Sequence, residues 1–138
     1  AITSPMTGGY QFGTVALGAT TISTAAIVVT NNGNVAQYFS IAISNSSPGT
    51  WAPNAGVPAS DQYRMMGFFN ATQPAASTFV DAMTTSVPGV AATLYGQAST
   101  RTNASAARNL WLRLEMPTAM TGAVSAQTMT LTINGQAS

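Results

Sequence analysis

A two-residue alternation of apolar and polar side chains recurs along this chain and constrains its fold more than any other feature. The alternation is clearest in Asn109 to Met116, where four apolar residues share one parity: Leu110, Leu112, Leu114 and Met116. Gln127 to Ile133 repeats it, with threonines at the alternate positions. Because successive side chains of a β-strand point to opposite faces, this spacing predicts strands rather than helices. We therefore expect an all-β chain.

Glycine, proline and asparagine divide the rest of the chain into further strand candidates, because these residues break β-ladders and form turns. The candidates are Tyr10 to Ala16, Ile22 to Thr30, Val35 to Ser44, Gln62 to Phe69 and Val90 to Tyr95. Asn31 to Asn34 has the composition of a hairpin turn, which predicts that the first three candidates form a meander. Asn134 and Gly135 are expected to close the last strand.

Three segments between these strands also carry expectations. Asn45 to Ser60 contains three prolines, which predicts a long loop, with Trp51 folded back as an anchor. Phe79 to Thr85 suits one helical turn as well as a short strand. Gln62 to Phe69 has apolar residues at both parities, so this strand is expected to be buried on both faces.

The opening third of the chain resembles a known family. Its residues are Phe12-Gly13-Thr14-Val15, then Gly18, then Val28-Val29-Thr30-Asn31-Asn32-Gly33-Asn34. This order is similar to the start of immunoglobulin-like domains of the abnormal-spindle and major-sperm-protein type, which read F-G-x-V, a glycine, an alternating strand and N-x-G. The resemblance implies an immunoglobulin-like β-sandwich and says more about fold than about function.

A second likeness concerns the later part of the chain. Trp111-Leu112-Arg113-Leu114 before Pro117, and Gln127 before the threonine-rich last strand, resemble small exported bacterial proteins of similar length and unassigned role. Length, strand spacing and the first resemblance together predict one immunoglobulin-like two-sheet sandwich of seven or eight strands. We expect this domain over residues 8–138, preceded by a tail over residues 1–7.

The chain is unusually poor in charge. Only 5% of its residues are charged and its net charge is +1, whereas ordinary soluble domains carry about 25% charged residues. Such a surface lacks the repulsion that keeps proteins apart at high concentration. The four arginines are isolated along the sequence, which argues against nucleic acid as a partner. No apolar run approaches the roughly 20 residues that a membrane-spanning helix needs.

The usual residues of catalysis are missing. The chain has no histidine and no cysteine, which excludes nucleophile–histidine arrangements, thiolate or imidazole metal sites and disulfides. Asp61, Asp81 and Glu115 are the only carboxylates, and nothing in their spacing brings two together. Asp61 and Asp81 also lack the dense acidic spacing of a calcium loop. We expect no enzymatic activity, no cofactor and no metal site.

A few residues remain candidates for binding roles. Arg113 and Glu115 share one face of a strand and suit an ion pair, within the domain or between subunits. Trp51, Tyr63 and Trp111 suit core packing, and less often an interface or a surface that stacks on sugars. Three sequons are candidate glycosylation sites: Asn45, Asn70 and Asn103.

These observations favour a structural role. A small first residue, Ala1, is what signal peptidase leaves, which predicts export to the extracellular space or cell surface. The tail, with apolar Ile2 and Met6, is expected to add a strand to a neighbouring subunit or fill a groove on it. The alternatives are a frayed terminus and an edge strand of its own domain. The chain is therefore expected to be a secreted, pilus-like homopolymer subunit. The alternatives are a carbohydrate- or cell-wall-binding module and a surface-layer or virion decoration subunit.

Overall fold

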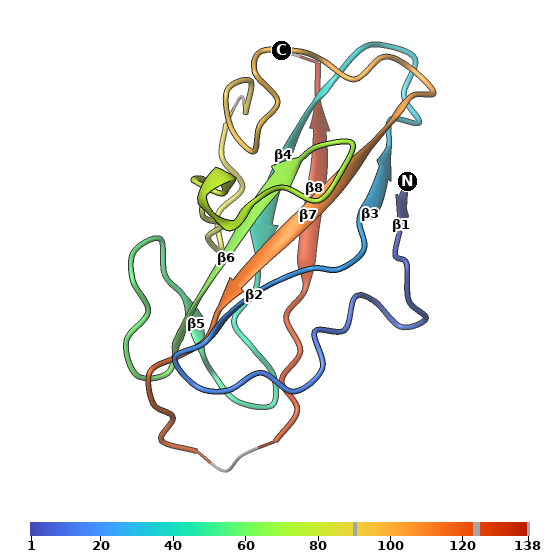
Figure 1. Ribbon diagram of the computed structural model, residues 1–138. Helices are drawn as coiled ribbons and strands as arrows, with labels where there is room; N and C mark the ends of the chain where they lie inside the picture. Colours follow the sequence, from blue (N-terminus) through green and yellow to red (C-terminus); the bar gives the residue numbers. More distant parts are fainter. Residues whose placement is uncertain (90, 123–124, 138) are drawn as a thin grey trace.

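The computed structural model describes residues 1–89, 91–122 and 125–137 and forms a two-layer β-sandwich (Figure 1). The larger sheet contains six strands: β1 (Ile2–Thr3), β2 (Thr20–Ile22), β3 (Ile27–Thr30), β5 (Ala52–Pro53), β6 (Gln62–Phe69) and β7 (Ala107–Glu115). The smaller sheet contains β4 (Tyr38–Ile43) and β8 (Leu131–Gln136). A single 3-10 turn, η1 (Ala76–Thr78), is the only helical element of the described residues. The predicted all-β sandwich is confirmed.

The strand order is that of an immunoglobulin-type sandwich. The larger sheet has the order β1-β3-β7-β6-β5. On the other side of the core, β4 and β8 pair with each other as the smaller sheet. With β2 and β3 counted as one interrupted strand, β1, β3, β7 and β6 correspond to strands A, B, E and D of such a sandwich. β4 and β8 correspond to its strands C and F, and β5 is an addition beside β6. The sandwiches of this class carry a further strand beside F. In the described part of the chain, β8 has no such neighbour.

The central strand β7 follows from the alternation of its side chains. Its Leu110, Leu112 and Leu114 are buried in the core between the sheets, and the opposite parity faces outward. β6 pairs with β7 from Arg64 to Phe69, and its first two residues pair with β5. Its inner face is buried and its outer face is half-buried, apart from the buried Met66. Its outward Met66 packs with Phe79 and Trp111 beneath the segment that contains η1. The core therefore has a second, smaller part outside the larger sheet.

The predicted strand Ile22 to Thr30 is interrupted. β2 and β3 lie end to end along β7, in registers that pair Ile22 with Arg113 and Ile27 with Leu110. Between them, the Ser23 amide donates to the Leu112 carbonyl (2.8 Å), and the Ser23 hydroxyl accepts from the Leu112 amide (2.9 Å). The side chain of Ser23 thus replaces a backbone acceptor at the break, which sequence alternation alone does not reveal.

The predicted hairpin after Thr30 is wrong. β3 belongs to the larger sheet and β4 to the smaller one, so residues 31–37 cross between layers and the first three candidates form no meander. Asn31 is buried and its Nδ2 donates to the carbonyls of Val35 (2.8 Å) and Thr102 (2.9 Å). The asparagine therefore holds a crossover connection, and Gly33 does not need a positive φ.

Two other strand predictions are also wrong. Tyr10 to Ala16 forms no strand, because Gly13 has a φ of 72° and turns the chain in the middle of the segment. Residues 91–95 form turns, and the Leu94 amide donates to the Ala91 carbonyl (3.1 Å). Val90, the first residue of that candidate, lies outside the described residues. Phe79 to Thr85 is neither helix nor strand and contributes one bridge, between Ala82 and Met66.

β4 and β8 differ in detail from the expected strands. β4 is buried on both faces rather than half-buried, because residues 84–89 and 91–102 cover its outer face. β8 starts at Leu131 and continues through Asn134 and Gly135, which were expected to end it. The long loop over residues 45–60 is confirmed apart from the short β5, and Trp51 is its buried anchor.

Candidate functional site

The three candidate interface aromatics lie inside the domain. Trp51, Tyr63 and Trp111 are all buried, which confirms the core-packing interpretation. The Tyr63 hydroxyl donates to the Ser44 carbonyl, and Trp111 Nε1 donates to the Asn70 carbonyl (2.9 Å). Burial also raises the pKa of the Tyr63 hydroxyl. These three residues therefore form no aromatic surface on which a sugar ring could stack.

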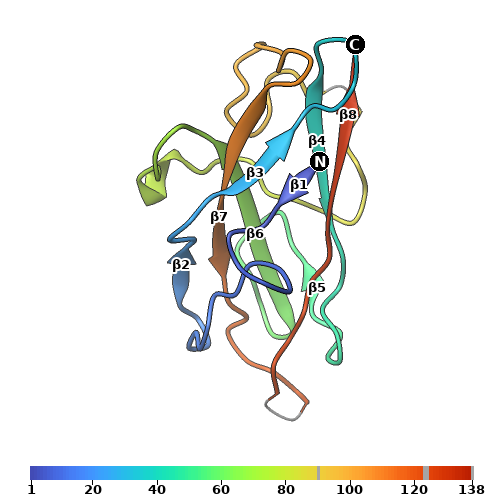
Figure 2. The ribbon, with the colours of Figure 1, turned by 90° about the vertical axis from the view of Figure 1, so that its right-hand side faces the viewer.

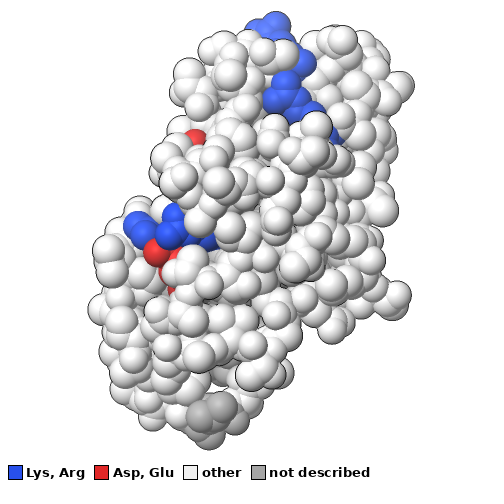
Figure 3. Space-filling model, in the orientation of Figure 1, with Lys and Arg blue, Asp and Glu red and all other residues white. Residues whose placement is uncertain are grey.

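Arg113 and Glu115 belong to a small ion-pair cluster on the outer face of the larger sheet. Glu115 Oε1 accepts from Nη2 of Arg64 (2.8 Å) on β6 and lies 3.5 Å from Nη2 of Arg113. The hydrogen bond from Arg64 is the main cause that lowers the pKa of Glu115. The ion pairing predicted within the strand and with its neighbour is present. Figure 3 shows this cluster and a second blue patch at the upper end of the same face, with largely uncharged surface around them.

The two aspartates accept hydrogen bonds from loop residues. Asp61 accepts from the Thr121 amide (2.9 Å) and hydroxyl (2.8 Å), and Asp81 accepts from the Tyr95 amide (2.7 Å). Within the described residues, no group of three or more carboxylate, histidine or cysteine side chains is close enough to hold a metal ion. The helical residues of the same part of the chain include no segment long and apolar enough to cross a membrane.

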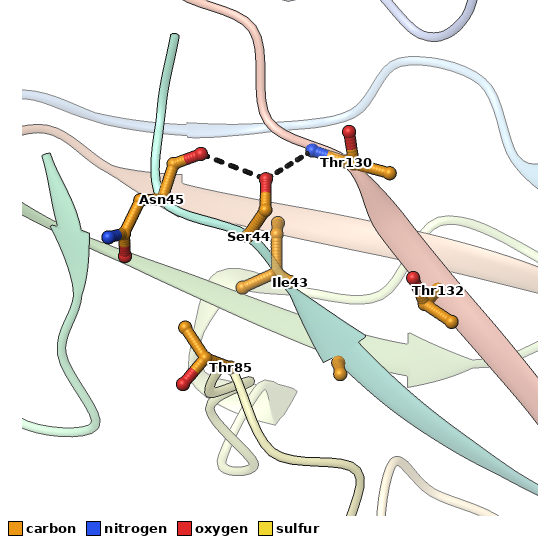
Figure 4. A pocket seen from close by; sticks show the side chains of 7 residues that line it. Ile43, Ser44, Asn45, Thr85, Thr130 and Thr132 are labelled. Carbon is orange, nitrogen blue, oxygen red and sulfur yellow. Dashed lines mark hydrogen bonds between the residues drawn. The ribbon is translucent and has the colours of Figure 1, made fainter. Parts of the chain in front are cut away.

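The three sequon asparagines are accessible. Asn45, Asn70 and Asn103 are all exposed and lie outside the strands. A shallow hollow of about 420 Å³ lies near the first of them, where β4 ends and β8 begins (Figure 4). There the Ser44 hydroxyl donates to the Asn45 carbonyl and accepts from the Thr130 amide, both at 2.8 Å. Its lining carries no titratable group, so the hollow provides no acid–base chemistry.

The N-terminal tail lies on its own domain. Ile2 and Thr3 pair with Val29 and Val28 of β3, which is the edge-strand arrangement expected as one alternative for the tail. The attachment is short: Ala1 and Thr30 exchange two backbone hydrogen bonds, of 2.6 and 2.7 Å. Met6 is only half-buried. The predicted donation of this tail to a neighbour stays a prediction.

The two edges of the smaller sheet differ in how many of their backbone groups are hydrogen-bonded. On the side of β4 away from β8, the Phe39 amide donates to Gln97 Oε1 (2.8 Å), and the Ile43 amide donates to the Thr84 carbonyl (2.9 Å). Gln97 Nε2 also donates to the Phe39 carbonyl (2.9 Å). This edge is therefore closed by residues 84–89 and 91–102, in which the described chain forms no strand.

The opposite edge, formed by β8, is open. Just beyond the ends of β4 and β8, the Ser44 amide donates to the Thr130 carbonyl (3.0 Å), and the register of the two strands repeats this hydrogen-bonded position at the even-numbered residues of β8. The backbone groups of Leu131, Ile133 and Gly135 consequently point away from β4. Within the described residues these groups have no hydrogen-bond partner in the protein.

β8 also lacks the devices that normally protect an edge strand. Proteins keep edges short or place charges, prolines or bulges on them. β1 and β5 have two residues each, and β5 contains Pro53. β8 has six residues, none of them charged and none proline. It is the long unprotected edge of the described structure.

Apolar side chains near this edge are incompletely covered. Ile133 is paired with fully buried Ile41 and so faces the core, yet it is only half-buried. Ile2 is paired with Val29, which is 2% exposed, and so shares its inner face, yet Ile2 is 51% exposed. Figure 2 views the side of the sandwich on which β1 and β8 lie. We call β8, with its inward-facing Leu131 and Ile133, the open edge.

Fold and site together define a β-sandwich domain with immunoglobulin-type strand order, in which β8 forms the long open edge of the described residues. No protein family, curated protein or solved structure matches the chain. The alternation of Gln127 to Ile133 predicts most of β8 as a strand, but no sequence signal shows that one side of it is open. That property depends on which segments lie beside it.

Proposed function

We propose that the protein is a structural subunit of an extracellular filament or pilus-like fibre that assembles by itself. The observation that carries this proposal is the open edge, since an unpaired, uncharged strand is a template for pairing with another chain. A contact between this edge and a different surface of the next copy is head-to-tail, and such contacts generate open filaments when the rotation does not close.

The charge of the molecule supports the same proposal. With four cations and three anions among 138 residues, copies packed side by side bring few like charges together. Within the described residues, the three acidic side chains accept hydrogen bonds from the chain itself. Close packing therefore requires little desolvation of free charge. Export and an absence of enzymatic activity belong to this proposal.

The alternatives have less support. A carbohydrate- or cell-wall-binding module needs exposed aromatic rings, and Trp51, Tyr63 and Trp111 are buried. A surface-layer or virion decoration subunit shares the low charge but assembles into a closed shell or a two-dimensional lattice. The shape of the assembly therefore separates these alternatives from a fibre.

Negative-stain electron microscopy of the purified, untagged chain at high concentration tests the proposal. We expect regular filaments whose mass increases with protein concentration in sedimentation velocity. A monomer that persists over this range would overturn the proposal and direct attention to glycan binding. Flat arrays or closed shells would favour the surface-layer or decoration alternative.

An edge-blocking variant makes the same test specific. In Ile133→Lys, the long side chain reaches solvent in the free subunit, but a strand added beside β8 would cover its charge. We expect folded monomers and a loss of filaments. Asn32→Lys adds the same charge at an exposed loop position and should leave filaments intact. Equal assembly of the two variants would exclude β8 as the contact.

A further inference from the structure

We infer that the open edge of one subunit is completed by residues 1–7 of a second copy, added antiparallel to β8 with Met6 opposite Leu131, Ser4 opposite Ile133 and Ile2 opposite Gly135. This inference rests on the proposed filament function and names the partner surface within it. The pairing of β1 with β3 would then belong to the unassembled subunit, and β1 would leave β3 on assembly.

The residue pattern of the tail fits the added strand. In an extended tail, Ile2, Ser4 and Met6 share one face, and these are the residues that would turn toward the core. Opposite residues in an antiparallel pair have side chains on the same face. The register places the small Ser4 against Ile133. It places Ile2 beside Gly135, where the side chain of Gln37 fills the space that a Cβ would take, so Ile2 would pack against that side chain.

The proline in the tail supports the same register. The outward backbone groups of β8 belong to its odd-numbered residues, so they bond the even-numbered residues of the tail. Pro5 then falls at a position whose missing amide would point away from β8, where an edge strand tolerates proline. A shift by one residue would aim Pro5 at β8 and turn Ile2 and Met6 to solvent.

The tail is also available for exchange. β1 has two residues, both exposed, and Ile2 is 51% exposed although it faces inward. Leaving β3 therefore gives up few hydrogen bonds and little buried apolar surface. Added along β8, the tail would pair the outward backbone groups of that strand, which have no partner in the single subunit, and would cover Leu131 and Ile133, which are half-buried there. In exchange, the tail gives up its pairing with β3 and its own turn, in which the Gly9 amide donates to the Met6 carbonyl (3.3 Å).

Disulfide trapping tests the register, because the chain has no cysteine of its own. Thr3→Cys and Asn134→Cys are introduced into separate chains, at exposed positions that the register places opposite each other. Their Cα atoms would be about 4.5 Å apart in a non-hydrogen-bonded pair, a separation that a disulfide can span. After mixing and mild oxidation, we expect mixed disulfide dimers at least tenfold above a Thr3→Cys and Asn32→Cys mixture.

The outcomes separate this inference from the proposed function. Filaments of the unmodified chain without the specific cross-link would overturn the inference and leave the function standing. Closed, cross-linked dimers without filaments would support the inference and overturn the filament. Monomers throughout, with no specific cross-link, would overturn both.

A matched pair of substitutions gives a second readout that does not depend on oxidation. Ile2 and Leu17 are similarly exposed in the subunit, at 51% and 45%, so aspartate at either position should leave folding nearly unchanged. The inference expects Ile2→Asp to abolish assembly, because its carboxylate would be buried beside β8 of the next copy. Leu17→Asp should assemble normally. Normal filaments of Ile2→Asp would overturn the inference.

Discussion

The side chain of Gln97 takes the place of a strand beside β4. It is 1% exposed, and its amide group both accepts from and donates to the backbone of Phe39. The same Nε2 donates to the Ala91 carbonyl (3.0 Å). The Gln97 side chain thus satisfies the amide and carbonyl of Phe39 on β4 and attaches the loop around Ala91 to this strand. In the sequence it looks like an ordinary polar loop residue, because its partners are distant along the chain.

Gly96, next to this glutamine, carries a prediction at the residue scale. Its φ is 72°, and a Cβ there would lie 2.6 Å from the ring of Phe68. We expect Gly96→Ala to lower the free energy of unfolding by about 1–3 kcal/mol, from backbone strain and overpacking. Urea unfolding measures it, with Gly89→Ala as control, since a Cβ at Gly89 meets nothing within 4 Å. Equal midpoints for the two variants would contradict the argument.

At the scale of elements, the break between β2 and β3 depends on Ser23. Its hydroxyl is the acceptor for the buried Leu112 amide (2.9 Å). Ser23→Ala leaves that amide without a partner, and we expect a loss of about 1–3 kcal/mol in stability. Faster hydrogen exchange of the Leu112 amide should accompany it. Ser60→Ala, at an exposed turn position, is the control. Unchanged exchange at Leu112 would show that Ser23 is not the needed acceptor.

The strands that sequence predicted well are the long ones with strong alternation. β6 has the bounds expected for it, and β7 differs from its prediction by two residues or fewer at each end. The failures are short segments, such as Tyr10 to Ala16, where four glycines in or near the segment adopt positive φ. Apolar content in such segments reflects packing against the sandwich from outside the ladders, as with Tyr10 and Phe12.

At the scale of the whole molecule, few ionisable groups link stability to pH. Burial raises the pKa of Tyr63 and, together with the charge of Asp81, raises the pKa of Tyr95 to about 12. In the unfolded chain both tyrosines titrate near the ordinary value of about 10. The stability that they contribute is therefore complete below pH 10 and decreases as the pH rises above it. Glu115 acts in the opposite sense, because its pKa is lowered on folding.

We therefore expect the thermal unfolding midpoint to be flat between about pH 5 and pH 9, since no histidine titrates there. It should fall at higher pH through the tyrosines and below about pH 4.5 through Glu115. Differential scanning calorimetry across this range measures it. Glu115→Gln should weaken the acid-side decrease and leave the alkaline side unchanged. A steep slope between pH 6 and pH 8 would contradict the assignment.

Of the two parts of the candidate site, the tail can be recognised from the sequence, whereas the open edge depends on contacts between distant residues. Sequence alone indicates the tail as a segment that can add a strand, because Ile2 and Met6 lie two positions either side of Ser4 in an uncharged stretch. It does not indicate the acceptor. The open side of β8 becomes visible only once β4 is paired with it and the loop that contains Gln97 closes the far side of β4.

The sequence by itself determined the all-β class, the central strands, the low charge and the core aromatics, since these follow from alternation and composition along one segment at a time. Only the tertiary structure decided that residues 31–37 cross between sheets, that Ser23 and Gln97 supply bonds to the ladders, and that β8 is open. The reason is physical: strand pairing joins residues distant in sequence, so an edge is a property of the assembled sheet.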